Sequence, residues 1–283
     1  MALEVRKVSL MNEKGEVVNC MLRSSFLNDL GGLGYEQDIS YLNYGDGFYA
    51  PLKSSHKQGM ISGRLSFIDR ATAYADYRKL MTWISYSETL REDRSIQFCY
   101  APYDGERFLR NVILTNVSKG ELDVGGFLSC NVDFIALTPW YTRNTLEITS
   151  RTISGVAGEN IPIYLDADMG GKYQLGLTGS IADPVVTLLD SSSNQKGIID
   201  LTGLTVTTGQ TLLISTIPGN IGIWKYDAYG VPTEVIDSLV FHDGYEVFFD
   251  IPTRESVTLT IRTASSGNTF TGTMDIYSYW RTR

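Results

Sequence analysis

The sequence has 283 residues, of which 43% are hydrophobic and 20% are charged, as in folded globular proteins and unlike disordered or fibrous ones. A chain of this length exceeds what one hydrophobic core usually serves, so we expect two domains. The net charge of −8 is uneven: residues 1–143 carry 16 basic and 17 acidic residues, whereas residues 144–283 carry 8 and 15. Because binding to a phosphate backbone needs a basic surface, the acidic second half argues against nucleic acid as a partner.

The composition also bears on membranes and on redox chemistry. The first residues contain no apolar stretch typical of a signal peptide, and no run of about 18 apolar residues occurs, so we expect no membrane insertion. Three widely spaced cysteines, Cys20, Cys99 and Cys130, stand among strand-like residues. We interpret them as buried reduced thiols, which predicts folding in a reducing compartment, the cytoplasm.

The first half of the chain predicts several short strands and a single helix. Period-two patterns favour strands over 3–10, 15–24, 41–53 and 59–68. The glycine-rich segment 30–35 lacks the Gly-Lys-Ser/Thr ending of a phosphate-binding loop, so we interpret it as a loop or bulge. A helix is predicted from about residue 71 to 88, with an apolar stripe formed by Tyr74, Tyr77, Leu80, Met81 and Ile84.

The stretch from Asn131 to Tyr141 closes this first half. A hairpin over 95–117 precedes it, and the strand 122–137 then alternates Val132, Phe134 and Ala136 on one face with Asp133, Ile135 and Leu137 on the other. Pro139 removes a backbone donor and should end the strand, which places Trp140 and Tyr141 at a seam with the second domain. One helix among antiparallel strands predicts an α+β domain over 1–145.

The second half predicts an all-β domain over 146–283, entered through a short polar joint near 142–158. Strands recur about every ten residues, separated by turns rich in Gly, Asn and Ser, which indicates an antiparallel β-sandwich or jelly roll and makes the whole protein mainly β. The predicted strands are 161–166, 172–179, 184–189, 197–201, 211–216, 221–226, 245–250, 257–262 and 272–280.

The motifs for catalysis and metal binding are weak. His56 and His242 stand in no zinc-binding pattern, and no Gly-x-Ser-x-Gly nucleophile elbow occurs. Asp166 and Asp168 resemble the start of a calcium loop, but its twelfth position would be Leu177 rather than Glu, so a solvated turn is the better interpretation. We therefore expect no catalytic, cofactor-binding or metal-binding residues and no enzymatic activity.

One aromatic cluster offers a binding surface. Trp224, Tyr226 and Tyr229 lie close together in the sequence, and Trp224 and Tyr226 share one face of a predicted strand. Such a cluster could stack on the rings of a glycan. It could equally be cross-strand packing or a protein interface, and both interpretations stay open.

The order of motifs in the first domain resembles the distal tail protein (Dit) family of long-tailed, non-contractile bacteriophages, the siphophages. The motifs are Tyr44-Gly45, Gly59 to Gly63 with Phe67, the aromatic-rich helix, Tyr100-Ala101-Pro102, and Phe134 through Tyr141. The second domain also resembles the family in its Gly176 to Gly179 segment, Asp183-Pro184, residues 208–212 and the Tyr277 to Arg281 ending.

This resemblance implies a structural protein of the virion tail tip, the hub of the baseplate. Relatives form a homo-hexameric ring through the first domain, with the tail tube protein above it and a tape-measure-linked tip protein below it. Their galectin-like second domain projects outward as a platform. We expect the helix 71–88 and the segment 30–35 to lie near the ring contacts.

Two points remain open beside this resemblance. The second domain lacks the long inserted arm with which some relatives hold receptor-binding proteins, so direct attachment of such proteins or of other baseplate proteins is undecided. The alternative function is a carbohydrate-binding β-sandwich module that recognises cell-wall glycan through Trp224 and Tyr226.

Overall fold

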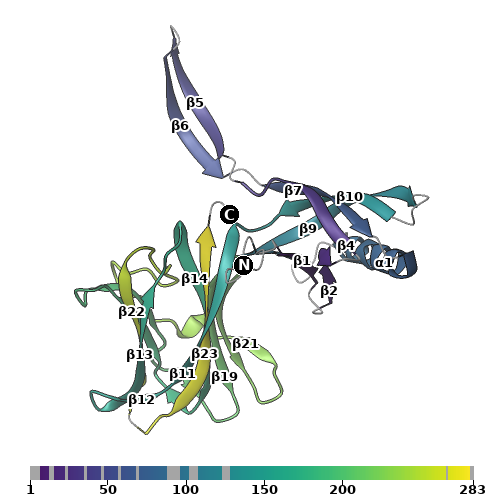
Figure 1. Ribbon diagram of the computed structural model, residues 1–283. Helices are drawn as coiled ribbons and strands as arrows, with labels where there is room; N and C mark the ends of the chain where they lie inside the picture. Colours follow the sequence, from purple (N-terminus) through teal and green to yellow (C-terminus); the bar gives the residue numbers. More distant parts are fainter. Residues whose placement is uncertain are drawn as a thin grey trace, which may run out of the picture. The chain divides into compact units, whose positions relative to one another are not determined.

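The computed structural model describes residues 7–12, 16–22, 25–34, 37–45, 48–56, 59–67, 70–87, 96–101, 108–122, 128–265 and 267–280. The chain divides into two compact units (Figure 1). Unit 1 comprises Met1–Thr142 with Trp280–Arg283, and unit 2 comprises Arg143–Tyr279.

Unit 1 is built from antiparallel strands and one helix, α1 (Arg70–Ser87). Its strands are β1 (Lys7–Met11), β2 (Val17–Asn19), β3 (Met21–Leu22), β4 (Ser25–Gly31), β5 (Gln37–Gly45), β6 (Phe48–His56), β7 (Met60–Phe67), β8 (Ile96–Ala101), β9 (Phe108–Leu122) and β10 (Leu128–Ala136). The long strand β9 joins two groups of strands. Its first residues pair with β8, which continues to β1 and β2, and its remainder pairs with β10, followed by β7, β4 and β3.

The core of unit 1 lies between these strands and α1. Val132 and Phe134 are fully buried and Ala136 is nearly so, whereas Leu137 is 49% exposed, which confirms the alternation expected from the sequence. From the helix, Leu80 is fully buried in the same core. The core is therefore assembled from residues distant in the sequence, as expected for antiparallel sheets.

Strands β5 and β6 form a separate two-stranded sheet (Figure 1). They pair with each other from Gln37↔His56 to Gly45↔Phe48, with two register shifts, and with no other strand in the described part of the chain. Because isolated two-stranded hairpins have little stability of their own, this hairpin is expected to gain order from a neighbour.

Unit 2 is a sandwich of two antiparallel sheets. The first sheet has the order β21 (Pro232–Glu234), β20 (Asn220–Tyr226), β19 (Thr211–Ile217), β14 (Met169–Gly179), β23 (Phe270–Trp280) and β11 (Trp140–Thr149). The second has the order β12 (Arg151–Ile153), β13 (Val156–Tyr164), β22 (Ser256–Arg262), β16 (Val185–Leu189) and β17 (Gln195–Asp200). A short pair, β15 (Ile181–Ala182) with β18 (Thr205–Val206), and the 3-10 helix η2 (Ile236–Ser238) complete the unit.

Two features of unit 2 correct the expectations from the sequence. Pro139 separates β10 from β11, as expected. The segment expected to be a polar joint is instead largely the strand β11. Its polar residues face solvent while Ile148 is buried, so a polar composition did not prevent a strand. Residues 245–250 do not form a strand. This segment makes only single bridges, such as Gly197↔Glu246, and it covers the edge of β17.

The mainly β, antiparallel fold class predicted from the sequence is confirmed. The cysteines are also as predicted: all three are free and buried. Burial, with smaller effects of Cys130 and Asp76, raises the pKa of Cys20 to about 12, and burial raises the pKa of Cys130 to about 11. These two thiols are therefore protonated and unreactive at neutral pH.

Candidate functional site

The outward face of the β9–β10–β7 sheet in unit 1 carries a row of apolar side chains. Ile135 of β10 is the direct partner of Ile113 on β9 and of Met60 on β7. Both isoleucines are half-buried, while Met60 is 58% exposed. Leu137 directly follows the end of β10 and is 49% exposed. We call Ile113, Ile135, Met60 and Leu137 the apolar row.

Helix α1 carries a second exposed apolar line. Leu80 is fully buried and Tyr77 packs against the core, but Tyr74 is 40% exposed and Met81 is 37% exposed. Tyr74 and Met81 are seven residues apart and so lie along one line of the helix. The apolar stripe expected from the sequence is thus too wide, because part of it faces away from the core; the side chain of Ile84 lies outside the described part.

The glycine-rich segment is a bulge followed by a sharp turn. The register of β4 with β7 shifts between Asn28 and Gly31, which confirms the bulge. Gly32 has a φ of +77°, and a Cβ at this position would lie 1.7 Å from the carbonyl oxygen of Met60. Only glycine tolerates both the backbone angle and this close approach, which fixes the turn beside the apolar row.

Trp140 anchors this turn. Its indole is fully buried, and its Nε1 donates a hydrogen bond to the carbonyl oxygen of Leu33 at 3.1 Å. Phe98 meets the ring edge-on at 5.9 Å between centroids, and Tyr100 lies at 6.0 Å. In the part of unit 1 described here, Trp140 therefore lies inside the unit's own core.

Arg110 is a buried cation that the sequence did not indicate. Its side chain is almost completely buried, its Nε donates to the carbonyl oxygen of Thr138 at 2.8 Å, and its guanidinium lies 5.5 Å from the Trp140 ring. Burial lowers the pKa of Arg110. Gly59 leaves the space for it, since a Cβ there would lie 2.8 Å from Nη2. Gly59 of the Gly59–Gly63 motif is therefore explained by its contact with the buried Arg110 guanidinium, which leaves no room for a side chain.

Polar residues fix the end of this region. The hydroxyl of Tyr141 accepts a hydrogen bond from Gln97 Nε2 and donates one to Asn111 Oδ1, both at 2.9 Å. The backbone N–H of Asn111 donates to Thr138 Oγ1 at 3.0 Å. The residues around Pro139 are therefore held rigidly against β8 and β9, which supports the adjacent end of the apolar row.

The aromatic cluster singled out in the sequence is brought together only in part. Trp224 and Tyr226 lie on the outward face of β20, and both are half-buried. The indole of Trp224 lies over Gly222, where a Cβ would come within 2.8 Å of the ring. Tyr229 is instead in the turn after β20 and is 93% exposed, with its backbone N–H bonded to Asp227 Oδ1. Packing over Gly222 accounts for the position of Trp224 without a ligand.

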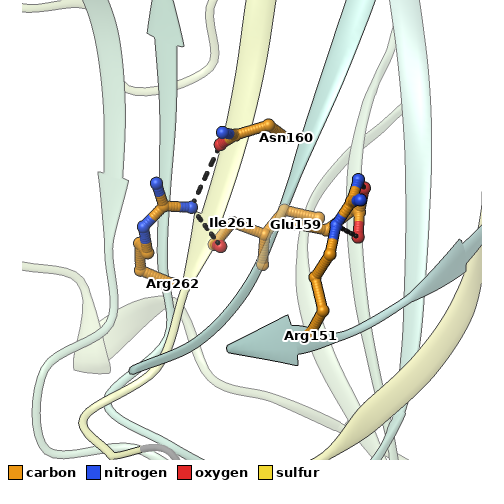
Figure 2. Close-up of polar contacts among 5 residues, drawn as sticks. All are labelled: Arg151, Glu159, Asn160, Ile261 and Arg262. Carbon is orange, nitrogen blue, oxygen red and sulfur yellow. Dashed lines mark hydrogen bonds and ion pairs between the residues drawn. The ribbon is translucent and has the colours of Figure 1, made fainter. Parts of the chain in front are cut away.

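The basic residues of unit 2 are largely engaged locally. Figure 2 shows two examples on β12, β13 and β22: Arg151 makes two hydrogen bonds to the Glu159 carboxylate, at 2.6 and 3.1 Å, and Arg262 donates to Asn160 Oδ1 at 3.1 Å. The two arginines lie on opposite sides of these strands. Since residues 144–283 carry 15 acidic and only 8 basic residues, these local pairs leave an excess of carboxylates.

The candidate metal and catalytic residues form no site in the described ranges. Asp168 lies 3.6 Å from Arg254 Nη2, and no group of three or more His, Cys, Asp or Glu residues among those described could hold a metal ion. His242 Nε2 lies 2.8 Å from Asp200 Oδ2. Burial opposes ionisation of Asp200, but hydrogen bonds from Thr202 and His242 outweigh it and lower its pKa. Of His56, only its backbone position in β6 is described.

Comparison with known proteins gives one family match. Residues 7–137 match the family model described as the N-terminal domain of the distal tail protein. No curated protein sequence matches the chain. No described helix combines the length and the apolar character needed to cross a membrane.

Solved structures of phage baseplate and distal tail proteins resemble nearly the whole chain. A chain of the phage P2 baseplate, in its activated conformation with calcium, superposes with a TM-score of 0.63 at 14% identity and covers 95% of this chain and 98% of its own. The crystal structure of the phage SPP1 Dit protein, called a paradigm of the hub adsorption apparatus in phages that infect Gram-positive bacteria, gives 0.57 at 10% identity, with coverages of 96% and 98%. At such low identity the similarity establishes the fold.

Proposed function

This chain belongs to the distal tail protein family through its residues 7–137, and from this premise we propose that it is a tail-tip hub. In this proposal six copies form a ring through unit 1. The ring joins the tail tube protein to the tape-measure-linked tip protein, and unit 2 faces the host-adsorption apparatus, where baseplate or receptor-binding proteins attach. The protein is then a non-catalytic component of the siphophage virion, assembled in the host cytoplasm.

The observation that carries this proposal is the apolar row within the matched residues. Met60 and Leu137 are 58% and 49% exposed, and they adjoin the half-buried Ile113 and Ile135. Grouped exposed apolar side chains are typical of protein interfaces. In a closed cyclic oligomer each copy uses two different surfaces, and we assign the apolar row to one of them.

We assign the second ring surface to helix α1, where Tyr74 and Met81 provide an exposed apolar line. The glycine-rich segment belongs to the first surface, because Gly32 packs against Met60 of the apolar row, and there Gly32 and Gly34 leave the backbone exposed. In the ring, the apolar row of one copy would contact helix α1 of the next copy. A stable interface needs both surfaces, because each one alone buries too little area. The hairpin β5–β6, which has no other strand partner in the described part of unit 1, is a further element for such contacts.

The domain arrangement and the galectin-like character of unit 2 also belong to this proposal. Unit 1 is taken as the ring-forming domain, near residues 1–145, and unit 2 as the outward sandwich, near residues 146–283. A glycan-binding function at Trp224 is not favoured, because packing over Gly222 explains that side chain. We instead take Trp224, Tyr226 and Tyr229 as part of a surface for proteins.

The double variant Met60→Glu with Leu137→Glu tests this proposal. Both side chains are well exposed in the single chain, so the variant should keep its circular dichroism spectrum and melting temperature while its mass in solution falls to that of one chain. Ile221→Glu is the matched control, because Ile221 is 50% exposed in unit 2 and should leave the ring intact. A double variant that still forms the ring would exclude the apolar row from the ring contacts.

A further inference from the structure

Unit 2 contains a cavity between β16 and the segment that follows η2. Its volume is about 170 Å³. The inner wall is apolar, with Leu188 1% and Phe249 2% exposed, and Pro252 beside them. Three acidic residues line the cavity at exposed positions: Glu246, Asp250 and Glu255. The cavity is thus apolar inside and negatively charged at its mouth.

The charge at the mouth is only partly neutralised by local ion pairs. Lys196 also lines the cavity, but its Nζ lies 3.5 Å from Asp190 Oδ2. Asp250 is paired with Lys172. Glu246 and Glu255 make no ion pair with any residue in the described part of the chain. Two carboxylates therefore remain available to a positively charged ligand.

A buried tyrosine packs behind the apolar wall of the same cavity. Tyr173 is completely buried, and its hydroxyl makes no hydrogen bond to any described residue. Its ring packs on Phe249, at 5.6 Å between centroids. Burial, and to a smaller extent the charge of Asp250, raises the pKa of Tyr173. An unsatisfied buried hydroxyl costs free energy, so a phenylalanine at this position should be tolerated.

We propose that this cavity binds the basic side chain, lysine or arginine, of a neighbouring protein. Such a side chain would place its aliphatic stem against Leu188 and Phe249 and its charged head between Glu246 and Glu255. A simple metal cation would leave the apolar wall unused, and a neutral apolar group would leave the carboxylates unpaired.

Charge complementarity argues that the occupant belongs to a protein. The half of the chain that forms unit 2 carries 15 acidic and 8 basic residues, so a basic protein surface is attracted to it over a wider area than the cavity itself. The bound side chain then acts as the anchor of that contact. This inference goes beyond ring formation, which involves unit 1.

The test is a titration of the full-length protein, followed by methyl NMR at Leu188. N-acetyl-lysine-N-methylamide should shift the Leu188 methyl signals in a saturable way, and the norleucine analogue, which has the stem without the charge, should not. Glu246→Gln with Glu255→Gln should weaken binding about tenfold, which corresponds to about 1.4 kcal/mol. Glu234→Gln, at an exposed position on β21, is the matched control and should bind normally.

Tyr173→Phe is a second control. It removes the unpaired hydroxyl behind the apolar wall, so the variant should be as stable as the natural protein or more stable, and should bind the lysine probe as the natural protein does. Equal shifts with lysine and norleucine probes, no shift at all, or binding unaffected by the two Gln substitutions would overturn the proposal. Equally tight binding of glucosamine would overturn the assignment to a protein side chain. The mass of the same samples reports ring formation separately, so either proposal can fail alone.

Discussion

The indole Nε1 of Trp140 donates a hydrogen bond to the carbonyl oxygen of Leu33 at 3.1 Å, across 107 residues of sequence. This contact ties the start of β11 to the glycine-rich turn of β4, and the same indole lies beside the buried guanidinium of Arg110. Trp140 is thus a core residue that holds the glycine-rich turn next to the surface that we assign to ring contacts.

Trp140→Phe removes this hydrogen bond and leaves a small cavity beside Arg110. We expect the free energy of unfolding of unit 1 to fall by about 2 kcal/mol, measured by urea denaturation. Trp224→Phe is the matched control, because Trp224 is half-buried on an outward sheet face and its loss should be smaller. Equal losses for both variants would contradict the anchoring role of Trp140.

Gly32→Ala tests the turn itself. The added Cβ would meet the Met60 carbonyl oxygen, and alanine is strained at a φ of +77°. We expect a loss of at least about 2 kcal/mol in unfolding free energy. Gly34→Ala should be nearly neutral, since a Cβ there has no atom within 4 Å. Similar melting temperatures for the two variants would show that the close approach at Gly32 is not required.

Gly197→Ala should disturb the second unit at the cavity wall. A Cβ at this position would lie 2.3 Å from the Phe249 ring, so the ring must move or the segment covering β17 must lift. We expect a loss of about 1–3 kcal/mol in thermal unfolding and weaker binding of the lysine probe. Gly176→Ala, whose nearest atoms would be 3.9 Å away, should change neither.

The stability of unit 2 should depend on pH through Asp275. Burial alone would raise its pKa, but the hydrogen bonds and charge of Arg143 with the hydroxyl of Thr145 outweigh it and lower the pKa. Because the pKa of Asp275 is lower in the folded state than in the unfolded state, its ionised form stabilises the fold. This stabilisation is complete above the unfolded-state pKa of about 3.9 and is lost as the pH falls through the folded-state pKa.

Asp275→Asn should therefore cost about 1 kcal/mol at neutral pH, a modest value because Arg143 is half-exposed. The difference from the natural protein should shrink as the pH is lowered below about 4, as followed by urea denaturation at each pH. Asp166→Asn, an exposed substitution, should show no such pattern. A difference that stays constant with pH would contradict the ion-pair explanation.

The sequence predicted helices and strands well where an element has one face buried in the core and the other exposed to solvent. The alternation around Phe134 and the helix that contains Leu80 are both visible in the sequence, because period and burial coincide there. The same reasoning failed for Tyr74 and Met81, since an apolar helical residue that serves an external surface looks the same in sequence as one that serves the core.

Contacts between distant residues could not be predicted. The burial of Arg110 in β9 depends on the missing side chain of Gly59, which precedes β7, and on the ring of Trp140 in β11. Phe249, which lines the cavity of unit 2, belongs to residues 245–250, which the sequence pattern predicts to be a strand. The apolar residues of this segment had a strand-like pattern, but they cover the sandwich as an irregular segment, and only the fold brings them to Tyr173.

The mass of the purified protein in solution, measured by light scattering after size exclusion at several concentrations, tests the central claim most directly. A hexameric hub predicts about 189 kDa (6 × 31.5 kDa), or a mixture of one and six copies that shifts toward the hexamer as concentration rises. A single species of 31.5 kDa at every concentration, in the natural protein, would contradict ring formation through unit 1.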